Sequence, residues 1–140
     1  MCGISGFVDY SKKLNTSSVN DMVKVLSHRG PDYLGTEFKN SKNFSIAFGH
    51  SRLSIIDLTS NANQPFFYNY KKFWLVYNGE IYNFLEIKKE LVALGFKFKT
   101  NSDTEVVLIA YLAWGNSCVE KFIGMFSFVI YDSTKEKIIG

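Results

Sequence analysis

The chain has 140 residues, of which 46% are hydrophobic and 21% charged, a balance typical of a soluble globular protein with one core. Its net charge of +3 comes from 16 basic and 13 acidic residues dispersed along the chain, which argues against binding to nucleic acid or to a membrane surface. No apolar run approaches the roughly 20 residues that span a bilayer, and no signal peptide is recognisable, so we expect a reducing, cytoplasmic location.

Strand-like and helix-like segments alternate through the first half of the chain. The first strand is predicted at residues 2–8, and a helix follows at 19–26, where Ser18 is placed to cap its first turn. Further strands are predicted at residues 44–49 and 73–77.

The clearest helix is predicted over residues 84–94. Its apolar side chains recur at helical spacing, Asn83 and Glu86 form a potential capping pair, and Gly95 provides a stop in the left-handed region. A short strand is expected next, at residues 96–98.

The last segments predict one more helix and two strands. Ser102 and Glu105 have the spacing of a capping box that opens a helix, and the apolar run 122–131 favours a strand buried on both faces. Residues 137–140 begin another strand, so we expect the chain to be a fragment of a longer protein. The fold class is mixed α and β (α+β), with a sheet covered by helices on at least one face.

Cys2 is the first candidate for catalysis because it follows Met1 directly. Removal of Met1 would give Cys2 a free α-amine with a pKa near 8, which can take the proton of the neighbouring thiol. The alternative is that Cys2 is a small buried apolar residue with no chemical role.

Four segments are dense in glycine or in polar groups next to predicted turns. They read CGISG at residues 2–6, HRGPD at 28–32, GHSRLSIID at 49–57 and NGEIYN at 78–83. Together, and in this order, they resemble the class II glutamine amidotransferase domain of asparagine synthetases, a branch of the N-terminal nucleophile hydrolases. The resemblance extends over residues 1–140, which would be one incomplete domain of this type without the synthetase domain.

The resemblance implies a fold and a reaction. The expected fold is a four-layer α/β/β/α sandwich, truncated at its C-terminal end. The expected reaction is hydrolysis of glutamine to glutamate and ammonia through a thioester on Cys2. In the full-length enzyme the ammonia would serve ATP-dependent synthesis of asparagine from aspartate.

The resemblance also assigns a substrate pocket. Arg52 is the expected clamp for the α-carboxylate of glutamine, because a planar guanidinium can bind a carboxylate through two hydrogen bonds. Backbone groups of four following residues are expected to line the same pocket: Leu53, Ser54, Ile55 and Ile56.

Asn78 and Gly79 are the expected oxyanion hole, formed by a side-chain amide and a backbone N–H. Asn-Gly is also a strong signal for a hairpin turn, and the two interpretations are compatible. Glu80 and Asp103 are expected to bind the substrate ammonium, although Asp103 also suits the first turn of a helix.

The other reactive side chains are expected to be structural. Class II domains use the terminal amine as base, so His28 and His50 are not predicted to be catalytic, and Cys118 is predicted to be a packed thiol. No metal or cofactor is expected for this domain, while the missing synthetase domain would use ATP and Mg²⁺. Glutamine and the synthetase domain are the expected partners, and a homodimer stays open. Two alternatives also stay open: a fragment that binds glutamine or acts as a scaffold without activity, and an amidotransferase for another acceptor such as a sugar.

Overall fold

The computed structural model describes residues 2–140, which form two compact units. The first unit contains the chain up to Ser54 together with Asn63–Pro65, and the second contains Ile55–Ala62 and Phe66–Gly140. Each unit consists of one antiparallel sheet with one helical layer, which confirms the predicted mixture of α and β structure. Within residues 2–140 no helix has the length and apolar character needed to cross a membrane.

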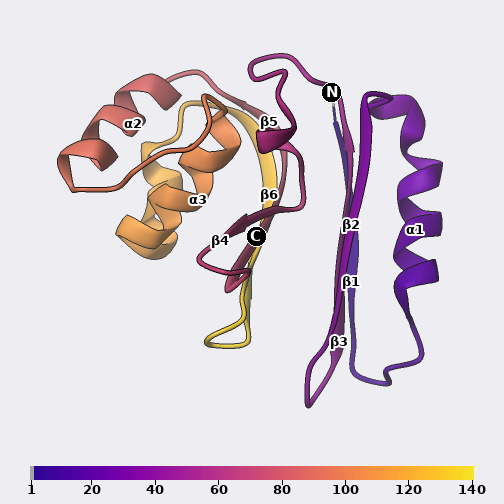
Figure 1. Cartoon of the computed structure of the whole chain (residues 1–140). Coiled ribbons are helices and arrows are strands. Elements are labelled where there is room, and N and C mark those ends of the chain that lie inside the picture. The colour runs from indigo at the N-terminus through magenta and orange to yellow at the C-terminus, as the bar shows by residue number, and fades with distance from the viewer. Residues whose placement is uncertain (1) are drawn as a thin grey trace. The chain divides into compact units, whose positions relative to one another are not determined.

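The first unit is a three-stranded sheet in the order β1-β3-β2, with α1 along one face (Figure 1). Its central strand is buried along its whole length, because each edge strand pairs with it and α1 packs on it. The elements are β1 (Gly3–Asp9), α1 (Thr16–Val25), the short 3-10 helix η1 (Ser27–Arg29), β2 (Tyr33–Asn40) and β3 (Ser45–Arg52).

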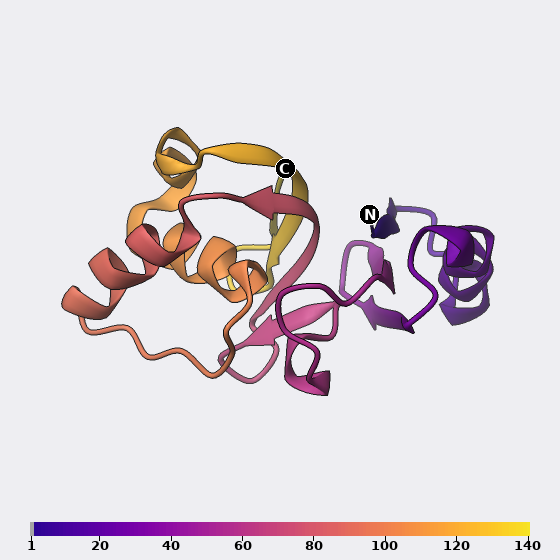
Figure 2. The ribbon, with the colours of Figure 1, turned by 90° about the horizontal axis from the view of Figure 1, so that it is seen from above.

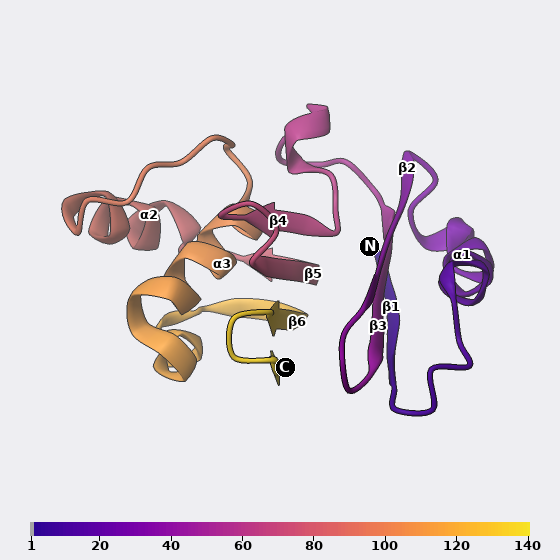
Figure 3. The same ribbon diagram turned by 60° about the horizontal axis from the view of Figure 1, so that its bottom comes forward.

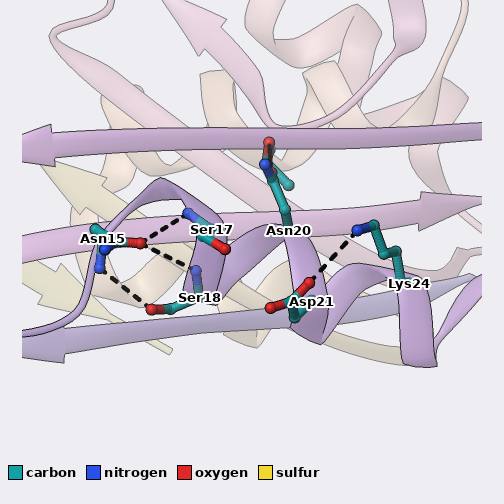
Figure 4. Close-up of polar contacts among 7 residues, drawn as sticks. Asn15, Ser17, Ser18, Asn20, Asp21 and Lys24 are labelled. Atoms are coloured by element: carbon teal, nitrogen blue, oxygen red, sulfur yellow. Dashed lines mark hydrogen bonds and ion pairs between the residues drawn. The ribbon is translucent and has the colours of Figure 1, made fainter.

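Helix α1 begins earlier than the sequence suggested. Its N-cap is Asn15, whose side-chain oxygen accepts hydrogen bonds from the backbone N–H groups of Ser17 and Ser18 (Figure 4). The Ser18 hydroxyl oxygen in turn accepts a hydrogen bond from the Asn15 N–H, so Ser18 is the third helical residue of a capping box and not the cap that we predicted. On the inner side, the Thr36 hydroxyl donates to the Asn20 side chain at 2.8 Å and ties β2 to α1.

The second unit is a four-stranded sheet in the order β4-β5-β6-β7 with two helices on one face (Figures 2 and 3). Neighbouring strands are antiparallel throughout. The elements are η2 (Ser60–Ala62), β4 (Phe66–Tyr68), β5 (Phe73–Ile81), α2 (Phe84–Ala93), α3 (Asp103–Trp114), η3 (Gly115–Lys121), β6 (Gly124–Asp132) and β7 (Lys137–Ile139).

Helix α3 is the centre of the second unit. It is mostly apolar around its whole circumference and is buried from Asp103 to Tyr111, as expected for a helix with neighbours on several sides. Its apolar side chains pack against α2 and the sheet, and the buried members of this core include Leu75, Ile87, Leu91, Leu108, Ile109 and Ile130.

Three predicted local features are wrong in the second unit. The Asn83 side chain does not cap α2: it donates to the carbonyl of Lys121 and accepts from the N–H of Ile123, and so holds the segment before β6. Residues 96–98 are a loop without a strand partner. Ser102 caps α3 through the Thr104 N–H, but no capping box forms with Glu105.

Local sequence pattern predicted the positions of some strands and not of others. β1, β3, β5 and β7 lie close to their predicted positions, whereas β2 and β4 were not predicted. β6 covers most of the apolar run 122–131, but only its C-terminal half is mainly buried, so the prediction of burial on both faces is wrong for its N-terminal half.

Candidate active site

The predicted site residues divide between the two units. Cys2, Arg52, Leu53 and Ser54 belong to the first unit. The second unit carries the other predicted residues: Ile55, Ile56, Asn78, Gly79, Glu80 and Asp103. Met1, whose removal the prediction requires, lies outside the described residues.

The Cys2 thiol lies against the backbone of Leu53. The Leu53 N–H donates to the Cys2 Sγ at 3.3 Å, and the thiol is 3.6 Å from the Leu53 carbonyl oxygen, to which it can donate. The sulfur thus meets both the N–H and the carbonyl oxygen of one residue of the backbone. Cys2 as a whole residue is only partly buried.

Two further contacts fix the surroundings of this thiol. The Arg29 Nε donates to the Cys2 carbonyl oxygen at 3.0 Å. Asp32 brackets Leu53 on both sides, since its N–H donates to the carbonyl of Arg52 at 3.0 Å and its Oδ2 accepts from the N–H of Ser54 at 2.7 Å. The peptide that contacts the sulfur is therefore held from both ends.

Arg52 is the last residue of β3, and only 6% of its surface is exposed. Its Nη1 donates to the Oδ1 of Asn63 at 2.6 Å. This bond is one of the contacts of a buried guanidinium, whose five N–H groups all need acceptors. Leu53 follows Arg52 directly. The residue that carries the guanidinium and the residue whose backbone contacts the Cys2 thiol are therefore neighbours in the chain, at and just after the end of β3.

Asn78 and Gly79 lie inside strand β5, not in a hairpin turn, so the turn prediction is wrong. They pair with Ser127 and Phe126 of β6. The Asn78 Oδ1 is buried and has no hydrogen-bond partner within residues 2–140, which is costly for a polar atom unless a ligand satisfies it. Gly79 has a φ of +155°, and a Cβ there would collide with the backbone of Met125 and Phe126.

Asp103 lies beside this part of β5. Its Oδ2 accepts from the Tyr77 hydroxyl at 2.6 Å and from the Ile81 N–H at 3.3 Å. The carboxylate is 4% exposed and begins α3, where the helix dipole favours a negative charge. The Ser102 hydroxyl also lies 3.4 Å from the Oδ1 of Asp103, so the carboxyl group has three protein donors for the roughly four acceptor positions of a carboxylate. Glu80, in contrast, is exposed on β5.

The remaining predicted residues behave differently from one another. Ile55 and Ile56 have exposed side chains and belong to the second unit, so the predicted pocket tract divides after Ser54. His28 is exposed and lies 3.0 Å from the carbonyl of Val25 through its Nδ1, a local contact at the end of α1.

His50 and Cys118 are both buried. His50 is fully buried in β3. Cys118 is buried in η3, and burial raises the pKa of its thiol from 9.0 to about 11, as expected for a packed thiol. Its sulfur is therefore a poor nucleophile at neutral pH.

Sequence reasoning missed four contact residues. Arg29 and Asp32 stand in the HRGPD segment and were recognisable as unusual. Nothing in the sequence indicated that Arg29 bonds to Cys2 or that Asp32 bonds to the backbone on both sides of Leu53. Asn63 and Tyr77 carried no signal at all. No group of three or more His, Cys, Asp or Glu residues in the described part of the chain is placed to hold a metal ion.

Comparison with known proteins gives a consistent family. The family model described as "Glutamine amidotransferase domain" matches residues 1–139. Putative asparagine synthetase [glutamine-hydrolyzing] 2 of Methanocaldococcus jannaschii is 40% identical, over 96% of this chain and 28% of its own length. Asparagine synthetase [glutamine-hydrolyzing] 3 of Bacillus subtilis is 37% identical, over 100% of this chain and 23% of its own length. Amidase chry2 of Gibberella zeae is also 37% identical, over 100% of this chain and 22% of its own length. The chain thus spans about a quarter of the length of these relatives.

Among solved structures, the chain resembles glutamine phosphoribosylpyrophosphate amidotransferase from B. subtilis, complexed with ADP and GMP. The TM-score is 0.72 at 19% identity, covering 93% of this chain and 35% of that chain. At this identity the likeness shows the fold alone, which is that of an N-terminal nucleophile hydrolase-type glutamine amidotransferase. The family model and the relatives go further: this chain belongs to the family of glutamine amidotransferase domains found in asparagine synthetase-like proteins.

Proposed function

We propose that this domain hydrolyses glutamine to glutamate and ammonia through a covalent thioester on Cys2. The observation that carries the proposal is the contact between the Cys2 sulfur and the Leu53 N–H, 3.3 Å apart, directly after Arg52. The thiol of the partly buried Cys2 thus contacts the backbone of the residue that directly follows the buried Arg52. A thiol nucleophile and a guanidinium are groups that a nucleophilic attack on a carboxylate-bearing substrate needs.

The first step forms the thioester. After removal of Met1, the α-amine of Cys2 accepts the thiol proton, and the thiolate attacks the side-chain amide carbon of glutamine. The C–N bond then breaks, and the proton held by the α-amine goes to the leaving nitrogen, so that ammonia departs. Water attacks the thioester in the second step, which releases glutamate and restores the thiol.

The other residues bind the substrate and the oxyanion. Arg52 holds the α-carboxylate, while Asp103 and Glu80 attract the α-ammonium group. The side-chain amide of Asn78 and the N–H of Gly79 stabilise the tetrahedral oxyanion, and removal of one such donor costs about 3–4 kcal/mol of barrier in well-studied cases.

In a longer protein, the ammonia would be used elsewhere in the chain. The names of the relatives from M. jannaschii and B. subtilis favour asparagine synthesis from aspartate, for which a synthetase domain would supply the ATP and Mg²⁺ site. A second candidate is ammonia transfer to a different acceptor, because amidase chry2 is as similar to this chain as one of the named synthetases. The half-reaction at Cys2 is the same in both cases.

The decisive experiment compares Cys2→Ala with Cys118→Ala. We expect Cys2→Ala to abolish glutamate release, and Cys118→Ala to retain it, because burial and a raised pKa make Cys118 unreactive. A chloroketone analogue of glutamine should add to Cys2 alone, as measured by mass spectrometry of the digested protein. Labelling of Cys118, or undiminished glutamate release by Cys2→Ala, would refute the assignment.

A further inference from the structure

We propose that Asn63 is a positioning residue for Arg52, and that its side-chain oxygen sets the orientation in which the guanidinium receives the substrate carboxylate. This inference rests on the proposed function, in which Arg52 is the carboxylate clamp. The observation is the 2.6 Å hydrogen bond from the Arg52 Nη1 to the Asn63 Oδ1, which is partly buried.

The Arg52 end of this bond is rigid. Arg52 ends the central strand of the first sheet, where it pairs with Tyr33 of β2. The side chain nevertheless has several rotatable bonds, so a fixed backbone does not by itself fix the guanidinium plane. Bidentate carboxylate binding requires that plane in one orientation, and a second hydrogen bond on the guanidinium supplies this constraint.

The Asn63 end is anchored by the next residue. Gln64 is 5% exposed, and its carbonyl oxygen packs against Gly35 of β2 so closely that a Cβ at position 35 would collide with it. Asn63–Pro65 therefore groups with the first unit, although the residues just before it belong to the second. One end of the hydrogen bond thus belongs to β3, and the other belongs to a residue whose neighbour packs on β2.

The chemistry of the partner matters as well. An amide oxygen accepts a hydrogen bond without a formal charge, so the bond to Asn63 adds no negative charge beside the guanidinium. A carboxylate in the same place would compete with the substrate carboxylate for the positive charge.

The first test needs no substrate. Rotation about the Nε–Cζ bond of Arg52 is measured by ¹⁵N NMR of the arginine side chains in the wild type, in Asn63→Ala and in Asn61→Ala. Asn61 is an exposed amide two residues earlier, which makes it a matched control. We expect several-fold faster rotation in Asn63→Ala and no change in Asn61→Ala. Equal rotation in wild type and Asn63→Ala would overturn the inference.

The second test uses saturation of Cys2 labelling by the chloroketone analogue of glutamine. In Asn63→Ala we expect a roughly three- to tenfold rise in the half-saturating concentration, with the maximal labelling rate within about twofold of wild type. Iodoacetamide, which has no carboxylate, should label Cys2 at unchanged rate. Asn63→His, whose neutral ring nitrogen Nδ1 lies as many bonds from the backbone as the lost oxygen, should recover most of the affinity.

The outcomes separate the two proposals. If Arg52→Lys does not raise the half-saturating concentration, the carboxylate clamp itself is wrong. If Arg52→Lys raises it and Asn63→Ala does not, the clamp stands and the role of Asn63 is refuted. If Asn63→Ala slows labelling by iodoacetamide as much as by the analogue, the residue is merely structural and the inference is also refuted.

Discussion

Glu105 lies in the first turn of α3 and is 1% exposed, yet it carries a carboxyl group. Both of its oxygens lie 3.0 Å from the N–H of Lys99, and its Oε2 also accepts from the Thr100 N–H at 2.7 Å and from the Thr100 hydroxyl at 2.8 Å. The side chain thus holds the loop before α3 against the helix. We predict that Glu105→Ala strongly destabilises the second unit.

The size of the expected loss of stability follows from the number of hydrogen-bond donors that lose their acceptor. Glu105→Ala leaves two backbone N–H groups and one hydroxyl without this partner, and a buried unsatisfied donor costs about 1–3 kcal/mol. Partial access of water to Lys99 lowers the sum, so we expect a loss of about 3–5 kcal/mol in the free energy of unfolding. This is a large share of the roughly 5–15 kcal/mol that stabilises a typical domain. Glu105→Gln keeps one acceptor oxygen and should lose only about 1–2 kcal/mol.

The natural probe is tryptophan fluorescence during urea unfolding. The chain has two tryptophans, Trp74 and Trp114, and both lie in the second unit, so the signal reports this unit directly. Glu86→Ala removes an exposed carboxylate from the first turn of α2 and should change stability by no more than about 0.5 kcal/mol. If Glu105→Ala unfolds within about 1 kcal/mol of the wild type, the hydrogen bonds of Glu105 do not stabilise the loop as we argue.

Two further predictions concern Asp9 and Gly79. Asp9 accepts several hydrogen bonds, the strongest influence being that of the Leu14 N–H, and these bonds lower its pKa from 3.8 to about 2. Because the pKa of Asp9 is lower in the folded state, its contribution to the free energy of unfolding is fully present above pH 4 and is lost as the pH falls through about 2. The pKa can be measured by a ¹³C NMR titration of the carboxyl group. A midpoint near 4 would contradict the prediction. Gly79→Ala places a Cβ against the backbone of β6, at a residue with a positive φ. We expect it to destabilise the second unit by at least about 2 kcal/mol in the same fluorescence assay. An unchanged unfolding midpoint would show that β6 can move away from the new Cβ.

Local sequence pattern predicted most of the helices and strands. It failed where a partner from elsewhere in the chain determines the structure of a segment. The two helices of the second unit were predicted because the apolar period and turn residues lie within each segment. β2 was missed because its side chains are mostly half-buried and show no clear alternation, and its pairing with β3 is what makes it a strand. Residues 96–98 have strand-like composition but find no strand to pair with.

Helix capping also depends partly on local sequence and partly on distant contacts. The polar residues near helix starts were recognised, but Asn83 bonds to residues near β6, and Glu105 bonds to the preceding loop. Sequence spacing gives each such side chain several acceptable partners. The packed structure selects one of them, because a buried donor without an acceptor costs more than an unmade cap.

By itself, the sequence determined the family and the residue types of the site, because Cys2, Arg52 and the Asn78-Gly79 pair stand in short segments with distinctive composition. Only the tertiary structure decided what each of them touches. Sheet register brings Leu53 to the Cys2 sulfur across 51 residues, and close packing at Gly35 brings Asn63 to Arg52. Such contacts depend on register, burial and backbone direction over the whole unit, which no single segment of the sequence specifies.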